Sequence, residues 1–338
     1  MSRWSIAYAC FVAVLSWNLS AANADAGGLI DSNNVSFVDQ TQTAATAWDG
    51  DTDSAEAPRW TVWAGAIFLQ RSSPRFESLL TDGSGELLNA RNFNFQPQGG
   101  PDINAIRHGE AFDIDFRYFQ VNQMSVGRTL FPNGESDFLL ADLLTVDSAQ
   151  IDAAYVTSLQ SVEINLRRNV SQRLTLLAGF RHITLRDDLA FRLEDDIDFG
   201  PFSLHLNGFN RLYGAQIGAD AILWSAGRFE LQSALKAGVY GNTAEGGLGL
   251  RALGFLEASI GKGKQHTAFV GDWNFTGLLR LNEIWAIRAG YQLLWISGVA
   301  LGSEQFSMFA TSLPALLTAN TSGDLFLHGA LVSLQASW

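Results

Sequence analysis

From residue 59 onward, apolar and polar residues alternate with a period of two along most of the chain. In 111–121, for example, Phe112, Ile114 and Phe116 share one face, while Asp113 and Asp115 share the other. Successive side chains of a β-strand point to opposite faces, so this pattern predicts strands with one apolar and one polar face. The same alternation recurs, least cleanly in the first segment, in 59–71, 159–167, 173–185, 212–224, 228–240, 267–281, 284–296 and 324–338.

The lengths of these segments and of their connections indicate a membrane protein. Most run for about 11 to 15 residues, whereas a globular strand usually has about five or six and a tilted strand crosses a bilayer in roughly 9–11. Outer-membrane barrels alternate short periplasmic turns with long external loops. The short connections are 169–172, 225–227 and 282–283, and the long ones are 186–210, 242–264 and 297–323. We therefore predict an all-β fold, a transmembrane antiparallel up-and-down β-barrel.

The expected number of strands follows from the direction of the last one. From the order of short and long connections, the last strand runs towards the periplasm, so that Trp338 lies on the periplasmic side. A first strand that starts on the same side requires an even number of strands. We place one weak strand near 86–95 to reach ten. Twelve strands would result if 250–260 and another segment also paired.

The N-terminal part predicts export. Arg3, an apolar run over 6–19 and small residues up to Ala26 have the form of a cleaved secretory signal, with cleavage after Ala24 or Ala26. We expect a signal peptide over 1–26, a flexible acidic leader over 27–58 and the barrel over 59–338. The single cysteine, Cys10, lies in the signal peptide, so the exported chain is expected to carry no disulfide.

Charge and hydropathy exclude two classes of protein. The formal net charge is −12, and a nucleic-acid binder needs a basic face, so we expect no nucleic acid as a partner. Beyond the N-terminus, no stretch approaches the roughly 20 consecutive apolar residues of a transmembrane helix. Only a barrel would then let the mature chain cross a membrane, and outer-membrane lipid is its expected partner.

The polar faces of the strands supply the candidate site. They carry acids and bases in nearly equal number, which predicts either a charged constriction that screens solutes or a ladder of ion pairs that closes a narrow lumen. The sequence leaves both open. The candidate lumen-lining residues are Asp113, Asp115, Arg117, Glu163, Arg167, Arg173, Arg181, Gln216, Asp220, Glu230, Lys236, Asp272, Arg280 and Arg288.

The last strand carries a candidate assembly signal. Alternate apolar residues lead back from a C-terminal aromatic residue, and we expect the barrel-assembly machinery to recognise them during insertion. The residues are Phe326, Val332, Leu334 and Trp338. Tryptophans near strand ends suit girdles at the two membrane interfaces. These are Trp60, Trp63, Trp285 and Trp295.

Two connections have unusual compositions. The segment 297–323 is rich in apolar residues, and we expect it to fold inward as a plug or to cap the barrel mouth. Acidic residues lie close together in 187–198, which suits a divalent cation only weakly, because no strict ligand spacing is present. A solvated acidic loop is the favoured interpretation, and no metal or cofactor is predicted. The five histidines are not paired with serines as hydrolysis requires, so we expect no enzyme.

Several stretches carry a family likeness: 179–185, 210–218, 236–240, 290–301 followed by Gln305, and 327–338. In these stretches the chain resembles the beta-barrel porin-7 family of bacterial outer-membrane proteins. The pair Gly302-Ser303 departs from the Ala-Pro-like pair expected of that family. The resemblance covers most of the barrel, implies a porin-like barrel in the outer membrane of a Gram-negative-type bacterium, and supplies no catalytic residues.

The charged inward faces favour a porin through which small polar solutes diffuse passively. The alternative is a non-conducting barrel that reinforces the membrane or binds a partner through its loops.

Overall fold

The computed structural model describes residues 58–82, 84–132, 136–138, 144–146, 150–196, 200–252, 256–305 and 319–338. The predicted signal peptide and almost all of the predicted leader therefore lie outside the described residues, and both remain predictions. The described residues belong to one compact unit, 43–338.

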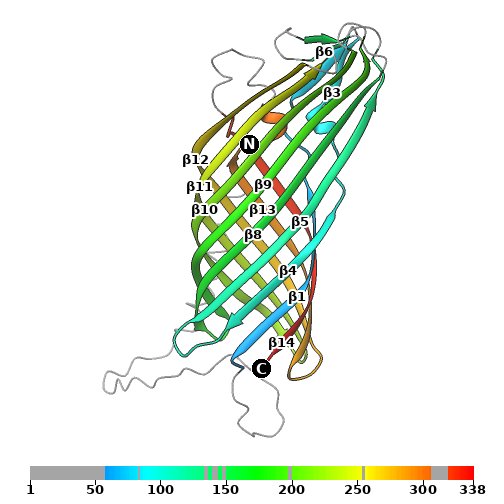
Figure 1. Ribbon diagram of the computed structural model, residues 1–338. Helices are drawn as coiled ribbons and strands as arrows, with labels where there is room; N and C mark the ends of the chain where they lie inside the picture. The colour runs from blue at the N-terminus through cyan, green and yellow to red at the C-terminus, as the bar shows by residue number, and fades with distance from the viewer. Residues whose placement is uncertain are drawn as a thin grey trace, which may run out of the picture. The chain divides into compact units, whose positions relative to one another are not determined.

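Ten antiparallel strands close into a barrel, in which the first strand pairs with both β4 and β14 (Figure 1). The predicted antiparallel up-and-down barrel of ten strands is confirmed. Its strands, in chain order, are β1 (Trp60–Arg71), β4 (Gln98–Arg107), β5 (Asp113–Leu130), β8 (Ile151–Ser171), β9 (Leu174–Asp196), β10 (Gly200–Ala226), β11 (Phe229–Ala252), β12 (Leu256–Arg280), β13 (Trp285–Val299) and β14 (Gly323–Ser337).

The weak strand was predicted at the wrong place. Its position in the barrel is taken by β4, whereas 86–95 contributes β3 (Gly85–Asn89) and the single 3₁₀ turn η1 (Ala90–Asn92). β3 belongs to a separate four-stranded sheet with β2 (Ser78–Asp82), β6 (Ser136–Phe138) and β7 (Leu144–Val146). The segment 250–260 adds no strand of its own, because it forms the ends of β11 and β12.

The tight turns lie at one end of the barrel, together with the C-terminus (Figure 1). At this end β10 leads directly into β11 through Gly227, whose φ of 56° lies in the left-handed region that glycine adopts readily. At the other end, most of the predicted loops 186–210 and 242–264 continue as strand. β9 to β12 therefore have 23 to 27 residues each.

An apolar band covers the outer surface over the half of the barrel next to the tight turns. On β10 to β13 it spans 213–223, 229–239, 269–279 and 285–295, which are eleven residues each, the length that a tilted strand needs to cross a bilayer. Exposed side chains in the band include Ile217 (68%), Val239 (56%) and Phe269 (41%). We call this band the belt. Trp60 and Trp285 are partly exposed at its edge, but Trp63 points inward, where the Arg288 guanidinium lies 4.3 Å from its ring centroid, so the girdle prediction is wrong for Trp63.

Beyond the belt, the sidedness of the strands inverts. On β9, Ile183, Leu185 and Leu189 point inward and are buried, while Arg186 and Asp188 point outward and are exposed. The barrel thus has an apolar core in the half away from the tight turns, and its outer surface there is polar. Among the described residues, no helix is long and apolar enough to span a membrane.

The lumen as the candidate functional site

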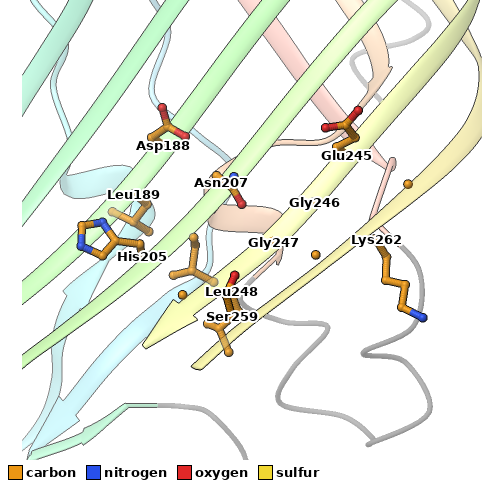
Figure 2. A pocket seen from close by; sticks show the side chains of 14 residues that line it. Asp188, Leu189, His205, Asn207, Glu245, Gly246, Gly247, Leu248, Ser259 and Lys262 are labelled. Atoms are coloured by element: carbon orange, nitrogen blue, oxygen red, sulfur yellow. The ribbon is translucent and has the colours of Figure 1, made fainter. Parts of the chain in front are cut away.

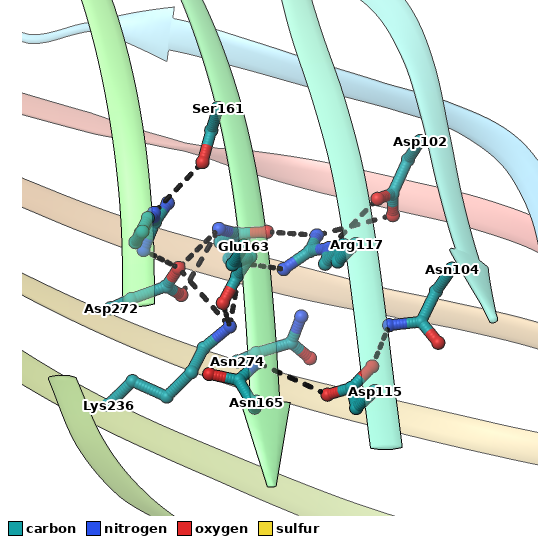
Figure 3. Close-up of polar contacts among 12 residues, drawn as sticks. Asp102, Asn104, Asp115, Arg117, Ser161, Glu163, Asn165, Lys236, Asp272 and Asn274 are labelled. Carbon is teal, nitrogen blue, oxygen red and sulfur yellow. Dashed lines mark hydrogen bonds and ion pairs between the residues drawn. The ribbon is translucent and has the colours of Figure 1, made fainter. Parts of the chain in front are cut away.

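A network of buried polar side chains crosses the lumen at the level of the belt (Figure 3). Glu163 on β8 lies at its centre and is 1% exposed. Its two carboxylate oxygens accept hydrogen bonds from Lys236 Nζ on β11, at 2.9 and 2.8 Å, and Oε2 also accepts from Gln216 Nε2 on β10 at 2.8 Å. Arg117 Nη1 on β5 lies 4.0 Å from Oε1. Side chains from four strands thus meet at one carboxylate.

Two arginines extend the network to other strands. Arg117 donates to both oxygens of Asp102 on β4, at 2.9 and 3.2 Å, and to Gln292 Oε1 on β13 at 2.9 Å. Gln292 Nε2 donates in turn to both oxygens of Asp272 on β12 at 3.1 Å. Arg181 on β9 donates to the same carboxylate at 3.0 Å. Two of these contacts, Arg117 to Gln292 and Arg181 to Asp272, join strands that are not neighbours in the barrel wall, so they bridge its interior.

A second group of polar contacts lies nearer the tight turns. Asp115 accepts from Asn104 Nδ2 at 2.7 Å and lies 3.7 Å from Arg167 Nη1. Arg167 Nη2 also pairs with Asp220 on β10 at 2.6 Å. Arg288 on β13 donates to Gln335 Oε1 at 2.9 Å. The contact between Arg167 and Asp220 joins β8 to β10, which are not neighbours, whereas the other contacts join neighbouring strands.

The structure brings most of the predicted lumen residues together and leaves a few apart. Arg173 lies in the turn between β8 and β9 and is exposed. The Arg280 side chain is 44% exposed and pairs with Glu230 at 3.1 Å, away from the central network. Asp113 is contacted by His108 at 3.1 Å beside the β4–β5 turn. The predicted residues that take part in the polar network are Asp115, Arg117, Glu163, Arg167, Arg181, Gln216, Asp220, Lys236 and Asp272.

The charges of the network are closely balanced. The cations Arg117, Arg167, Arg181 and Lys236 face five carboxylates, which belong to Asp102, Asp115, Glu163, Asp220 and Asp272. A buried charge is tolerated only when it is paired and hydrogen-bonded, and here each cation has a carboxylate within 4 Å. The arrangement fits the ladder of ion pairs that the sequence left as one of two interpretations.

A second buried polar cluster closes the barrel beyond its apolar layer. Arg71 at the end of β1 bonds to Asp187 on β9 and to Thr157 on β8. Tyr155 donates to Asp187 Oδ2 at 2.7 Å, and the Arg71 guanidinium lies 4.6 Å from the centroid of the Tyr155 ring. Arg71, Asp187, Tyr155 and Thr157 are at most 2% exposed. We call these four residues the upper cluster.

The upper cluster holds a segment of the β13–β14 connection inside the barrel. Gly302 N donates to Asp187 Oδ2 at 2.9 Å, and Ser303 N donates to the Tyr155 hydroxyl at 3.2 Å. Asn210 on β10 donates to Ala300 O and accepts from Ala300 N, both at 2.7 Å. Residues 302–305 form one helical turn, visible in orange within the barrel in Figure 1. The described part of this connection is therefore a plug, one of the two arrangements expected, while 306–318 lie outside the described residues.

The barrel wall is shaped to receive this plug. A Cβ at Gly208 would collide with the backbone of Ala300, and one at Gly246 would collide with the Gln305 side chain. From the opposite side, Phe93 and Phe95, which follow η1, pack edge-on against Tyr155 at centroid distances of 5.3 and 5.4 Å. Two connections thus meet inside the barrel mouth.

Two carboxylates influence each other at the mouth. Burial raises the pKa of Glu77, and the nearby negative charge of Glu304 raises it further. Burial also raises the pKa of Glu304, with contributions from Asp324 and Asp187, against the lowering effect of Arg75 and of a hydrogen bond from Ser322. Glu77 precedes β2, and Glu304 lies in the helical turn of the plug. Protonation at either site would therefore favour the docked arrangement.

The acidic segment 187–198, a weak candidate for a cation site, has side chains on both faces of β9. Asp187 points inward to Arg71, whereas Asp188, next to it on β9, points outward. The side chains of 194–196 and residue 198 lie outside what the structure describes. Within the described residues, no three His, Cys, Asp or Glu side chains gather as a metal site would require.

Sequence reasoning missed the upper cluster and part of the network. Arg71, Tyr155 and Thr157 lie where the predicted strands end or beyond, and Asp187 was placed in a loop. Asp102 and Asn104 were missed because β4 was misplaced. Asn165 and Gln292 lie on the polar faces of the predicted strands 159–167 and 284–296. This alternation could have identified them as lumen-lining residues.

The structure thus defines a closed ten-stranded barrel of the transmembrane type with a bridged lumen. No family model and no curated protein sequence matches the chain, so the resemblance to the porin-7 family stays a prediction. Among solved structures, the chain is similar to the outer membrane protease OmpT from Escherichia coli, with 7% identity and a TM-score of 0.39, over 86% of this chain and 99% of that one. It is also similar to the P. putida toluene transporter TodX, with 8% identity and a TM-score of 0.32, over 84% and 90%. A Pseudomonas aeruginosa FadL homologue matches with 10% identity and a TM-score of 0.24, over 82% and 89%. At these identities and scores, none of the three assigns an activity to this chain.

Proposed function

We propose that the protein is an outer-membrane β-barrel of a Gram-negative-type bacterium, and that its lumen does not conduct in the conformation described here. The observation that carries the proposal is the polar network, because Arg117, Glu163 and Asp272 connect strands on different sides of the lumen. Such a barrel would reinforce the membrane or present its outer end to a partner.

The membrane part of the proposal is supported by the belt. A continuous apolar surface that encircles a closed sheet is matched to hydrocarbon, and water would penalise it strongly. Outer-membrane lipid is therefore the proposed partner of the belt, and the barrel-assembly machinery is the proposed partner of the last strand during insertion.

Conductance in a planar bilayer tests the proposal. The full-length mature protein would be refolded in detergent, and its folded state verified by the shift in gel mobility on heating. We expect no stepwise current from the folded protein at either polarity. Regular current steps that scale with the amount of folded protein would contradict a closed lumen.

Passive diffusion of small polar solutes is a second candidate. It is favoured by the polar character of the network and by Arg167 Nε and Arg181 Nη2, which have no hydrogen-bond partner among the described residues and are suited to water. This candidate predicts that vesicles containing the protein swell in a small neutral sugar. It also predicts that Glu163→Gln or Lys236→Gln would shift the ratio of cation to anion current in opposite directions.

A further inference from the structure

An outward-facing groove lies on the wall of the barrel beyond the belt. It has a volume of about 630 Å³ and is formed by β9 to β12 (Figure 2). The strand pairing places the outward side chains of Asp188, His205, Asn207, Glu245 and Ser259 around it. The strands are paired with each other here, so the polar side chains, rather than the backbone, are available to a ligand.

The floor of the groove is made of glycines. Four of them, on two neighbouring strands, share the outward face: Gly247, Gly249, Gly261 and Gly263. Glycine within a strand weakens it and often marks a place where another molecule approaches closely.

The inward glycines of the same wall have a different explanation. Gly208 and Gly246 are required by the plug, as described above. A Cβ at Gly249 would instead meet nothing nearer than His205 Cβ at 3.8 Å, and one at Gly261 nothing nearer than Gly246 O at 4.0 Å. Packing within the protein therefore does not account for Gly249 or Gly261.

The position of the groove restricts its ligand. On β12, Gly263 and Ser259 lie six and ten residues beyond Phe269, the last outward residue of the belt. At about 3.3 Å per residue this is roughly 20–33 Å along a tilted strand. The groove thus lies past the hydrocarbon and its bordering phosphates, at the level where the saccharides of the outer leaflet extend.

The lining of the groove favours a polyhydroxylated ligand that is held mainly by hydrogen bonds. The Glu245 carboxylate lies 3.6 Å from Arg211 Nη1. Burial and the neighbouring charge of Asp187 raise the pKa of Asp188, against the lowering effects of Arg186 and His205. The Glu245 carboxylate is therefore compensated, the Asp188 carboxyl group offers oxygens that accept hydrogen bonds, and Asn207 and Ser259 both donate and accept.

We propose that this groove binds a saccharide chain, with the glycines of β11 and β12 as its floor and with Asp188, His205, Asn207 and Ser259 as hydrogen-bonding partners. The saccharide has two sources, the headgroup of an outer-leaflet glycolipid or a free oligosaccharide. The proposal goes beyond the proposed function and rests on it only for the orientation of the barrel in the membrane.

Isothermal titration of the folded full-length protein in detergent tests the proposal with three probes: rough-type lipopolysaccharide, its lipid-free core oligosaccharide, and lipid A without the core. We expect saturable binding of the intact glycolipid and weak or no binding of lipid A. Binding of the free oligosaccharide as well would indicate that the groove also takes soluble chains, whereas its failure to bind would assign the headgroup as the source.

Gly249→Phe fills the groove and should lower the affinity for the intact glycolipid by about tenfold or more, because the side chain takes the place of the ligand. Gly241→Phe is its matched control, since Gly241 lies on the same strand and face with an equally open surrounding, 3.9 Å from Tyr213 O, but outside the groove. Both variants would first be shown to fold by their heat-dependent gel mobility.

Absence of saturable binding of both saccharide probes would overturn the proposal. So would equal affinities of the Gly249→Phe and Gly241→Phe variants. None of these outcomes depends on conductance, so a failure of this proposal is distinguishable from a failure of the closed lumen.

Discussion

The Glu163 carboxylate shows how single residues stabilise the bridged lumen. It is almost fully buried in the lumen at the level of the belt, and its oxygens accept hydrogen bonds from Lys236 and Gln216. Removing one partner of such a pair leaves the other charge buried and uncompensated, which is far more costly than removing both. The contribution of this residue is therefore best measured against that of its partner.

Lys236→Met should destabilise the folded barrel by about 3–5 kcal/mol, because Glu163 loses its nearest cation in a buried site. The double variant Glu163→Gln/Lys236→Met should cost clearly less than the sum of the two single changes. Urea unfolding in detergent, followed by tryptophan fluorescence, gives these values. The exposed Lys262 provides the control, since Lys262→Met should change stability little. Additive effects at 163 and 236 would contradict the pairing.

The raised pKa values of Glu77 and Glu304 predict how the stability of the fold depends on pH. Both pKa values are raised above 4.5, their ordinary value, so the folded state binds more protons than the unfolded state between 4.5 and the raised values. Stability should therefore fall as the pH rises through this interval, and Glu304→Gln should flatten the dependence and stabilise the neutral protein. Melting temperatures of the two proteins across the interval provide the measurement. Parallel curves for both would contradict the effect.

At the scale of elements, strand patterns predicted the part of the fold that carries the belt. Alternation identifies 228–240, 267–281 and 284–296 because β11 to β13 carry apolar side chains of the belt on one face and polar side chains on the other. The remainder of β9 and β10 was predicted as loop because sidedness inverts there, so no apolar outer face marks the strand.

β4 was missed for a different reason. Its sequence contains Gly99, Gly100 and Pro101, which are typical of turns. Pro101 is tolerated because β4 pairs with β5 only from Asp102 onward, so that the missing N–H interrupts no hydrogen bond to β5. The cross-lumen contacts could not be predicted at all, since they depend on which strands face each other after closure.

Whether the upper cluster holds the plug can be tested with a thiol at position 303. Ser303 is 3% exposed, and the only native cysteine lies at position 10, so Ser303→Cys provides a single thiol in the predicted mature chain. Asp187→Ala should increase the rate of modification of this thiol by about tenfold or more, because the change removes the acceptor of Gly302 N and leaves Arg71 without its partner.

Asp188→Ala in the same Ser303→Cys background is the control, since Asp188 points away from the plug. Labelling with a water-soluble maleimide, quenched at intervals, provides the rates. Equal rates in the Asp187 and Asp188 variants would show that the upper cluster does not hold the plug.

At the scale of the whole molecule, the barrel is completed by its two end strands. Trp338 N donates to Trp60 O at 3.0 Å, and Trp338 O accepts from Arg59 N and Trp60 N at 2.7 and 2.9 Å. The side chains of the predicted assembly signal, Phe326, Val332, Leu334 and Trp338, share the outward face and are 38–58% exposed. They are thus presented to the surroundings rather than to the lumen.

Trp338→Ala should slow insertion in cells while leaving the urea midpoint of the folded barrel nearly unchanged, because the backbone bonds of residue 338 are retained. The fraction of heat-modifiable protein in the outer membrane after a short pulse of synthesis measures insertion. Ser337→Ala, on the inward face, is the control. Equal insertion of the two variants would exclude Trp338 as part of the assembly signal.

The pairing of β1 with β14 has a consequence for synthesis. A chain that lacks only its last strand cannot close, and it presents two unpaired sheet edges together with an uncovered apolar surface. Free edges of this kind recruit other chains. Every nascent copy must therefore be shielded from its neighbours until β14 has been added, and a chain truncated before β14 would yield aggregates rather than a smaller barrel.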